Sequence, residues 1–92
     1  MALLLNIDGE NKQISPKNKK DFQISELNNF VGRPIEVAYL HNRQEYLVFN
    51  EEGKLKDLPI NTEATRIYRK NHSGSMDMIV GNAILCSKNE IK

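Results

Sequence analysis

The stretch NEEGKLKDLPINTEA, residues 50–64, specifies more local structure than any other part of this chain. Its Glu-Glu-Gly-Lys run predicts a tight turn in which Gly53 takes a positive φ, a backbone conformation that glycine adopts without steric cost. Leu55 and Leu58 are expected to return to the core, and Pro59 stiffens the exit from the turn. The stretch thus predicts a turn, an apolar contact and the start of a helix in succession.

A helix is predicted immediately after this turn, over residues 62–70. Asn61 is a preferred N-cap residue, and Glu63 places an acid in the first turn, where the helix dipole favours negative charge. Basic residues occupy the last turn, where the dipole favours positive charge. The apolar side chains expected to face the core are Ala64, Ile67 and Tyr68.

The segments before the turn predict a short helix and two paired strands. Ser25 can cap a helix of one to two turns that ends at Gly32, since Pro34 forbids its continuation. Residues 35–40 and 45–50 have strand composition and are joined by a polar stretch of hairpin length. Both faces of the second strand carry apolar side chains, so we expect a helix to cover one face and a second subunit the other. The apolar side chains of the short helix that are expected to face the sheet are Ile24, Leu27, Phe30 and Val31.

Further strands are predicted at the two ends of the chain. An apolar strand is expected over residues 1–7, with a short return strand over residues 11–15. Gly81 is expected to interrupt a last strand over residues 78–86, because glycine inside a strand signals a bulge or a close backbone approach. Polar segments complete the chain: a flexible link over residues 71–76 and a frayed tail over residues 87–92. These segments predict a single compact α+β domain over residues 1–92, an antiparallel sheet of about four to five strands with two helices.

The composition limits the classes of protein to which this chain can belong. The chain has 92 residues, of which 39% are hydrophobic and 27% charged, as expected for one folded domain with a single small core. Lys and Arg number 13 and Asp and Glu 12, so the net charge of +1 lacks the basic excess of a nonspecific nucleic-acid binder. The net charge of the chain therefore does not indicate which kind of partner it binds.

Neither export nor membrane insertion is predicted. Cys86 is the single cysteine, so no internal disulfide can form, and the N-terminus lacks the features of a signal peptide. The apolar run from Leu3 to Leu5 is far shorter than the roughly 20 residues that cross a bilayer. We expect a cytoplasmic protein with no membrane partner.

No residue pattern predicts catalysis, a bound metal or a cofactor. Glu51 and Glu52 are sequence neighbours that point apart in an extended chain, which does not suit paired acid-base work. His41, His72 and Cys86 lack the paired spacing of zinc ligands. We therefore expect a protein that is not an enzyme and that holds no metal or cofactor.

Two polar regions are candidate binding sites. The end of the helix predicted over residues 62–70 carries bases beside an aromatic ring, a combination that can hold phosphates and stack a nucleobase. A solvated helix end would carry the same residues. The turn after residue 50 offers polar groups to a ligand or partner, as an ordinary structural turn also does. The candidate residues are Asn50, Glu51, Lys54, Arg66, Tyr68, Arg69 and Lys70.

A series of short motifs carries a family resemblance. The motifs are Glu26-Leu27, Val31-Gly32, Ile35-Glu36-Val37, Asn50-Glu51-Glu52-Gly53-Lys54-Leu55, Leu58-Pro59, Asn61, Ala64-Thr65, Asp77 and Ile79-Val80-Gly81-Asn82. Over residues 22–86 the chain resembles the domain of unknown function 3846 family of small phage, plasmid and conjugative-element proteins. The resemblance implies a small α+β domain from a mobile element, and it brings no settled activity and no catalytic residues.

Three functional hypotheses follow. The first is a non-catalytic phage or mobile-element protein that antagonises host defence in the bacterial cytoplasm, by binding a defence protein or by sequestering a small nucleotide signal. The second is a nucleic-acid-associated regulator of the element, a weaker expectation. The third, a small hydrolase or transferase, lacks an activated nucleophile at recognisable spacing. The second hypothesis requires one surface to gather Lys19, Lys20, Arg66, Arg69 and Lys70. We also expect self-association through a face or an edge of the sheet.

Overall fold

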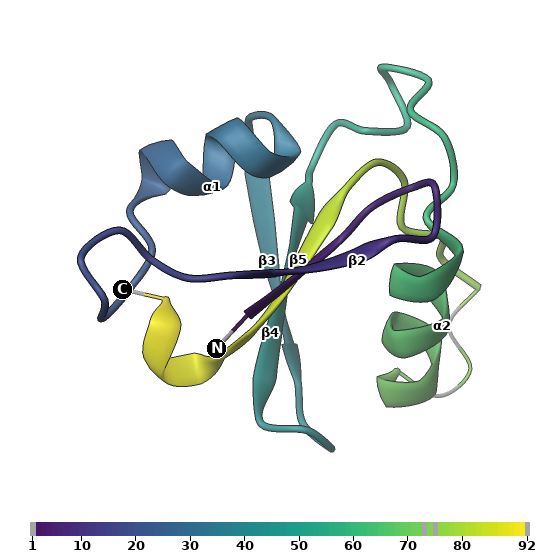
Figure 1. Cartoon of the computed structure of the whole chain (residues 1–92). Coiled ribbons are helices and arrows are strands. Elements are labelled where there is room, and N and C mark those ends of the chain that lie inside the picture. The colour runs from purple at the N-terminus through teal and green to yellow at the C-terminus, as the bar shows by residue number, and fades with distance from the viewer. Residues whose placement is uncertain (1, 73, 75, 92) are drawn as a thin grey trace.

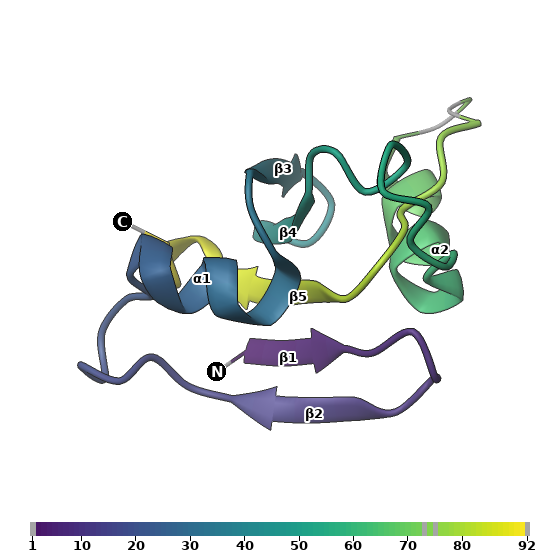
Figure 2. The same cartoon turned by 90° about the horizontal axis from the view of Figure 1, so that it is seen from above.

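A five-stranded antiparallel sheet forms the centre of the molecule, and one helix lies on each side of it (Figure 1, Figure 2). The computed structural model describes residues 2–72, 74 and 76–91. The elements are β1 Ala2–Leu5, β2 Asn11–Ile14, α1 Ile24–Val31, β3 Ile35–Leu40, β4 Glu45–Asn50, α2 Thr62–Asn71, β5 Ala83–Ser87 and the 3-10 helix η1 Lys88–Glu90. The predicted α+β class, with its compact single domain, is confirmed.

The last strand of the chain lies in the middle of the sheet. The strand order is β2-β1-β5-β4-β3. Two local hairpins, β1–β2 and β3–β4, therefore flank β5, and Leu85 pairs with Leu3 on one side and with Leu47 on the other. The sheet is complete only when the end of the chain inserts between the hairpins.

The alternation of side chains along the strands divides the core into two halves. On β4, Val48 faces α1 and Leu47 faces α2, as the period of two requires. The α1 half contains Ala2, Leu4, Phe22, Leu27, Val31, Val48, Ile84 and Cys86. The α2 half contains Leu5, Leu40, Leu47, Ala64, Ile67, Ile79, Ala83 and Leu85. The prediction that a second subunit covers the other face of β4 is therefore wrong, because α2 of the same chain covers it.

The turn after β4 differs from the prediction at two residues. Gly53 does not adopt a positive φ. Its lack of a side chain is needed for a different reason, since a Cβ atom there would lie 2.6 Å from Cγ2 of Val80. Leu55 is 84% exposed, because the backbone bond from Leu58 N–H to the Gly53 carbonyl closes a loop with Leu55 near its tip. Leu58, in contrast, is half-buried, as expected.

The first helix begins earlier than predicted. Its N-cap is Gln23, because Glu26 lies three residues further on and its Oε2 accepts from the Gln23 N–H at 2.9 Å. Ser25 consequently lies inside the first turn. Ile24 is 68% exposed and does not join the apolar stripe that the sequence predicts.

The C-terminal part of the chain is more ordered than predicted. Gly81 has φ +78°, so β5 starts only at Ala83. After β5, η1 ends at Glu90, which is 7% exposed, and Ile91 forms a bridge with Phe22. The expected fraying does not apply to residues 87–91.

A few expectations fall on residues that the structure does not describe. These are Met1 of the predicted first strand, Ser73 and Ser75 of the link, and Lys92 of the tail. In the described part of the chain, neither helix combines the length and the apolar composition that a membrane crossing needs.

Candidate functional site

A small cavity opens between the end of β4, the loop after it, α2 and the segment that leads to β5. Its volume is about 150 Å³, and we call it the β4–α2 cavity. Four of the seven candidate residues line it: Asn50, Glu51, Lys54 and Tyr68. The other lining residues are Glu36, Phe49, Asp77, Met78, Ile79 and Val80.

Asn50 holds the backbone beneath this cavity. Its Nδ2 donates to the carbonyl oxygen of Val31 at 3.2 Å, and its Oδ1 accepts from the backbone N–H of Glu52 at 2.8 Å. The residue is only 5% exposed, so both bonds are largely shielded from water. Asn50 thus ties the end of α1 to the loop that carries Glu51 and Lys54.

Aromatic rings form one wall of the cavity. The Phe49 and Tyr68 rings meet edge to face, with centroids 6.4 Å apart and an interplanar angle of 80°. On its other side, Tyr68 stacks on His72 at 4.2 Å and 13°. Burial raises the pKa of the Tyr68 hydroxyl, and the charges of Asp77 and Glu36 raise it further. The hydroxyl therefore stays protonated at neutral pH and acts as a hydrogen-bond donor.

Carboxylates outnumber ammonium groups around the cavity. Glu36, Glu51 and Asp77 carry negative charge, and Lys54 alone carries positive charge. The Lys54 Nζ lies 4.0 Å from Asp77 Oδ1, and both side chains are well exposed, at 60% and 68%. An ion pair this exposed is worth about 0–1 kcal/mol and is easily rearranged. The cavity therefore favours a cation.

Sequence reasoning missed Glu36 and Asp77 as members of this site. Glu36 comes from β3 and Asp77 from the segment after α2, so neither lies near the turn that carries Glu51 and Lys54. The one signal in the sequence was that both residues fall in the motifs of the family resemblance.

The three remaining candidates lie on other sides of α2. Arg69 donates from Nε to the carbonyl oxygen of Asp77 and from Nη2 to that of Met76, both at 3.0 Å. Arg66 pairs with Glu63, one turn earlier. Lys70 is exposed and lines neither this cavity nor the shallow hollow beside the two arginines. That hollow is lined by Ile60, Thr62, Thr65, Arg66, Arg69 and Met78. The predicted combination of bases and an aromatic ring is thus divided between faces of the helix.

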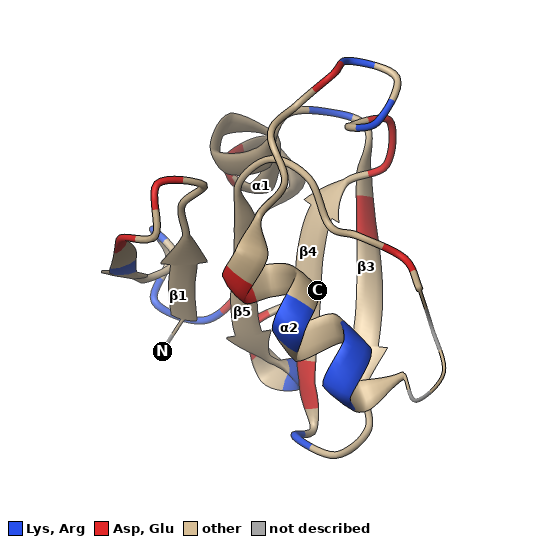
Figure 3. Ribbon diagram, turned by 90° about the vertical axis from the view of Figure 1, so that its right-hand side faces the viewer, with Lys and Arg blue, Asp and Glu red and all other residues tan. Residues whose placement is uncertain are grey.

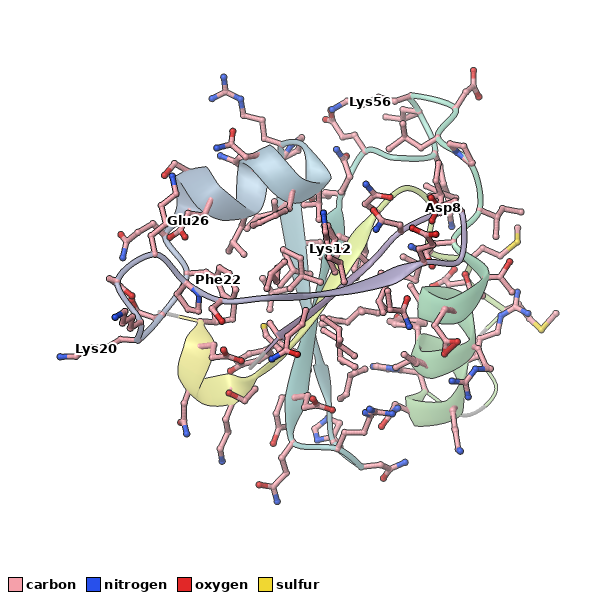
Figure 4. The ribbon with its side chains drawn as sticks, viewed as in Figure 1. Asp8, Lys12, Lys20, Phe22, Glu26 and Lys56 are labelled. Atoms are coloured by element: carbon pink, nitrogen blue, oxygen red, sulfur yellow. The ribbon has the colours of Figure 1, made fainter. Side chains whose placement is uncertain are left out.

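Basic side chains do not gather on one surface. Lys20 lies at the end of the molecule opposite α2 (Figure 4). Figure 3 shows basic positions on α2, on the loop after β4 and on the β3–β4 turn, with acidic positions among them. The five lysines and arginines that a nucleic-acid regulator requires are therefore dispersed over opposite parts of the fold.

Nucleophilic chemistry at Cys86 and metal binding both lack support in the described residues. Cys86 is fully buried on the α1 side of the sheet, and burial raises the pKa of its thiol to about 12. Such a thiol is not a nucleophile at neutral pH. Within the described part of the chain, no three His, Cys, Asp or Glu side chains come together as metal ligands.

A family model described as Domain of unknown function (DUF3846) matches residues 2–92. The match is wider than the residues 22–86 that carried the resemblance, and it includes the β1–β2 hairpin and η1. Neither the curated proteins nor the solved structures contain a match to the chain. With its whole described fold inside the matched range, the chain belongs to the DUF3846 family.

Proposed function

We propose that this protein is a non-catalytic accessory protein of a phage or other mobile element. In this proposal it acts in the cytoplasm of the bacterial host and antagonises a defence system by binding a defence protein. The family resemblance supports the mobile-element origin. The observation that carries the mode of action is the β4–α2 cavity, with its volume of about 150 Å³ and its excess of carboxylates.

A protein partner suits this cavity better than a nucleotide signal. Pockets that enclose small-molecule ligands usually measure about 300–1,000 Å³, at least twice the volume of the β4–α2 cavity. A nucleotide phosphate would also meet Glu36, Glu51 and Asp77, whose negative charges repel it. The arginines that would neutralise a phosphate are engaged elsewhere, Arg69 with backbone carbonyls and Arg66 with Glu63.

A binding role also suits the state of the reactive side chains. The Cys86 thiol is buried and protonated, and the raised pKa of Tyr68 keeps its hydroxyl protonated. Neither group offers the activated nucleophile or base that a hydrolase or transferase needs. The dispersed lysines and arginines make the nucleic-acid regulator the weaker alternative.

Phage challenge tests the proposal in cells. The protein would be expressed in bacteria that carry a panel of defence systems, and plaque formation would be compared with that of cells lacking it. We expect it to restore plaques against at least one system, and Tyr68→Ala to abolish the rescue. Lys70→Ala, an exposed change on the same helix outside the cavity, is the matched control.

The mode of action is tested by capture from the rescued cells. We expect a component of the defeated defence system to co-purify with the parent protein and to bind it again when both are purified. Native mass spectrometry would look for a retained nucleotide in the same sample. A retained nucleotide without a bound defence protein would replace this proposal with sequestration, and salt-dependent DNA binding would replace it with the regulator.

A further inference from the structure

The charges and rings of the β4–α2 cavity specify what kind of group enters it. We propose that the cavity binds an arginine side chain presented on the surface of the partner protein. This inference rests on the proposed function, since it assumes that the partner is a protein, and it adds the chemistry by which that partner is recognised. Each lining element contributes to the argument.

Charge complementarity gives the sign of the ligand. Glu36 comes from β3, Glu51 from the loop after β4, and Asp77 from the segment after α2, so acidic residues of three elements line the cavity. A guanidinium presents five N–H donors in a planar fork, and it can bond carboxylates on more than one side. A compact ammonium is a point charge that makes less use of acids spread around a rim.

The aromatic wall favours the same ligand. A guanidinium over the Phe49 ring gains a cation–π interaction of about 0.5–1 kcal/mol at an exposed site and more when desolvated, whereas Tyr68 already stacks on His72. Met78, Ile79 and Val80 supply apolar surface for the methylene stem of the side chain. Arginine is also among the residues that most often anchor protein interfaces.

The dimensions suit the end of one long side chain. A volume of about 150 Å³ corresponds to roughly five waters at ~30 Å³ each, enough for the end of one long side chain. A bare metal ion does not suit the site, because in the described residues no three acids approach closely enough to coordinate it. An extended organic cation reaches the separate carboxylates that a metal ion cannot.

Lys54 sets the selectivity of the entrance. Its ammonium lies 4.0 Å from Asp77, in a weak pair that is open to water. A guanidinium that bonds Asp77 competes with this exposed ammonium. An anionic side chain that bonds Lys54 would instead face the three carboxylates. The exposed pair thus admits a cation and rejects an anion.

Titration of the isotope-labelled protein with N-acetyl-arginine amide tests the proposal. We expect saturable amide shifts at Glu51, Tyr68 and Asp77 in the millimolar range, and no saturable shifts with N-acetyl-citrulline amide, the uncharged isostere. N-acetyl-lysine amide should bind more weakly than the arginine probe. Equal shifts from the arginine and citrulline probes would overturn the proposal.

Variants assign the binding to the cavity. Glu36→Gln and Asp77→Asn should each weaken the arginine probe roughly 2- to 5-fold, the range for one partly exposed ion pair. Glu52→Gln removes a neighbouring exposed carboxylate that does not line the cavity, and it should leave binding unchanged. A spectrum that retains the parent's dispersion shows that each variant is folded. Parent-like affinity in both folded cavity variants would rule the cavity out as the site.

The two proposals fail separately. The titration uses only the purified protein and a small probe, so its result does not depend on any host component. Arginine binding in the absence of any rescued or captured defence system would overturn the proposed function alone. A captured defence protein that binds Glu36→Gln and Asp77→Asn as tightly as the parent would overturn the arginine anchor alone.

Discussion

Asn61 Nδ2 donates to the carbonyl oxygen of Leu5 at 2.8 Å, which joins the start of α2 to the end of β1. The same amide nitrogen donates to the Gly81 carbonyl at 2.9 Å, and Oδ1 accepts from the backbone N–H of Ala64 at 3.0 Å. Asn61 is 1% exposed. One buried side chain therefore caps the helix and bonds two segments from opposite ends of the chain.

Asn61→Ala should be among the most destabilising changes in the molecule. It removes an N-cap worth about 1 kcal/mol and leaves the buried carbonyls of Leu5 and Gly81 without their donor, at about 1–3 kcal/mol each. We expect the free energy of unfolding in urea to fall by roughly 3–7 kcal/mol. Thr62→Ala, an exposed neighbour, should change it by no more than ~0.5 kcal/mol. Equal effects of the two substitutions would refute the role assigned to Asn61.

Gly53→Ala tests why glycine is needed in the turn after β4. A methyl group at this position would lie 2.6 Å from Cγ2 of Val80, so we expect a loss of about 1–3 kcal/mol from overpacking. The loss should be smaller in a Val80→Ala background, where the clashing methyl groups are absent. A double-mutant cycle by chemical denaturation measures this coupling. A cost independent of the Val80 side chain would refute this explanation.

Arg69→Ala should loosen the wall of the β4–α2 cavity. The guanidinium holds the carbonyls of Met76 and Asp77, and two such bonds contribute about 0.5–1.5 kcal/mol each. We expect hydrogen exchange at the buried amide of Ile79, whose N–H donates to Thr65 Oγ1 at 2.9 Å, to accelerate roughly tenfold or more. Lys70→Ala serves as the control on the same helix. Unchanged exchange in Arg69→Ala would mean that other contacts hold this segment.

Glu26 should contribute to the acid sensitivity of the fold. Its pKa is lowered from 4.5, because the backbone N–H groups of Gln23 and Lys17 bond the charged carboxylate. A lowered folded-state pKa adds stability above the unfolded value, and this stability is lost as the pH falls through the folded value. The stability gap between parent and Glu26→Gln should therefore be widest near neutral pH and narrow below pH 4.5.

Urea midpoints measured from pH 7 to pH 3 check this expectation. Glu52→Gln, which removes an exposed carboxylate instead, should follow the parent curve closely. A gap between parent and Glu26→Gln that stays constant with pH would show that Glu26 acts by packing and not through its charge.

Self-association should use the outer edge of β3. α1 and α2 pack on the two faces of the central strands, and the other edge strand, β2, carries the exposed Lys12, a type of residue that protects edges. On β3, Val37 is 39% exposed beside unpaired backbone groups. We expect light scattering at high concentration to give a mass above that of the monomer, and Val37→Lys to restore the monomer. Gln13→Lys on β2 should not, and a monomeric parent at all concentrations would contradict the prediction.

The local elements could be predicted from the sequence because their causes lie within a few residues. The β3–β4 hairpin follows from two strand-like segments joined by a short polar turn, and α2 follows from the cap at Asn61 with an acid in the first turn and bases in the last. The predicted strand over residues 78–86 is shorter than expected, because β5 begins only at Ala83, after the positive φ of Gly81. The error at Gly53 arose because Val80, far along the chain, decided the outcome. The error at Ser25 was local, since the Gln23–Glu26 capping box that starts the helix lies within three residues.

The arrangement of these elements was decided by tertiary structure. Placing β5 between the two hairpins pairs residues from opposite ends of the chain, and no local periodicity encodes that choice. The same long-range packing put α2 on the face where a second subunit was expected, and it gathered Glu36, Tyr68 and Asp77 from three separate elements around one cavity. The sequence by itself determined the elements and the caps, because these depend on neighbouring residues. The two-sided core and the cavity depend on which apolar faces meet, and that was settled only by folding.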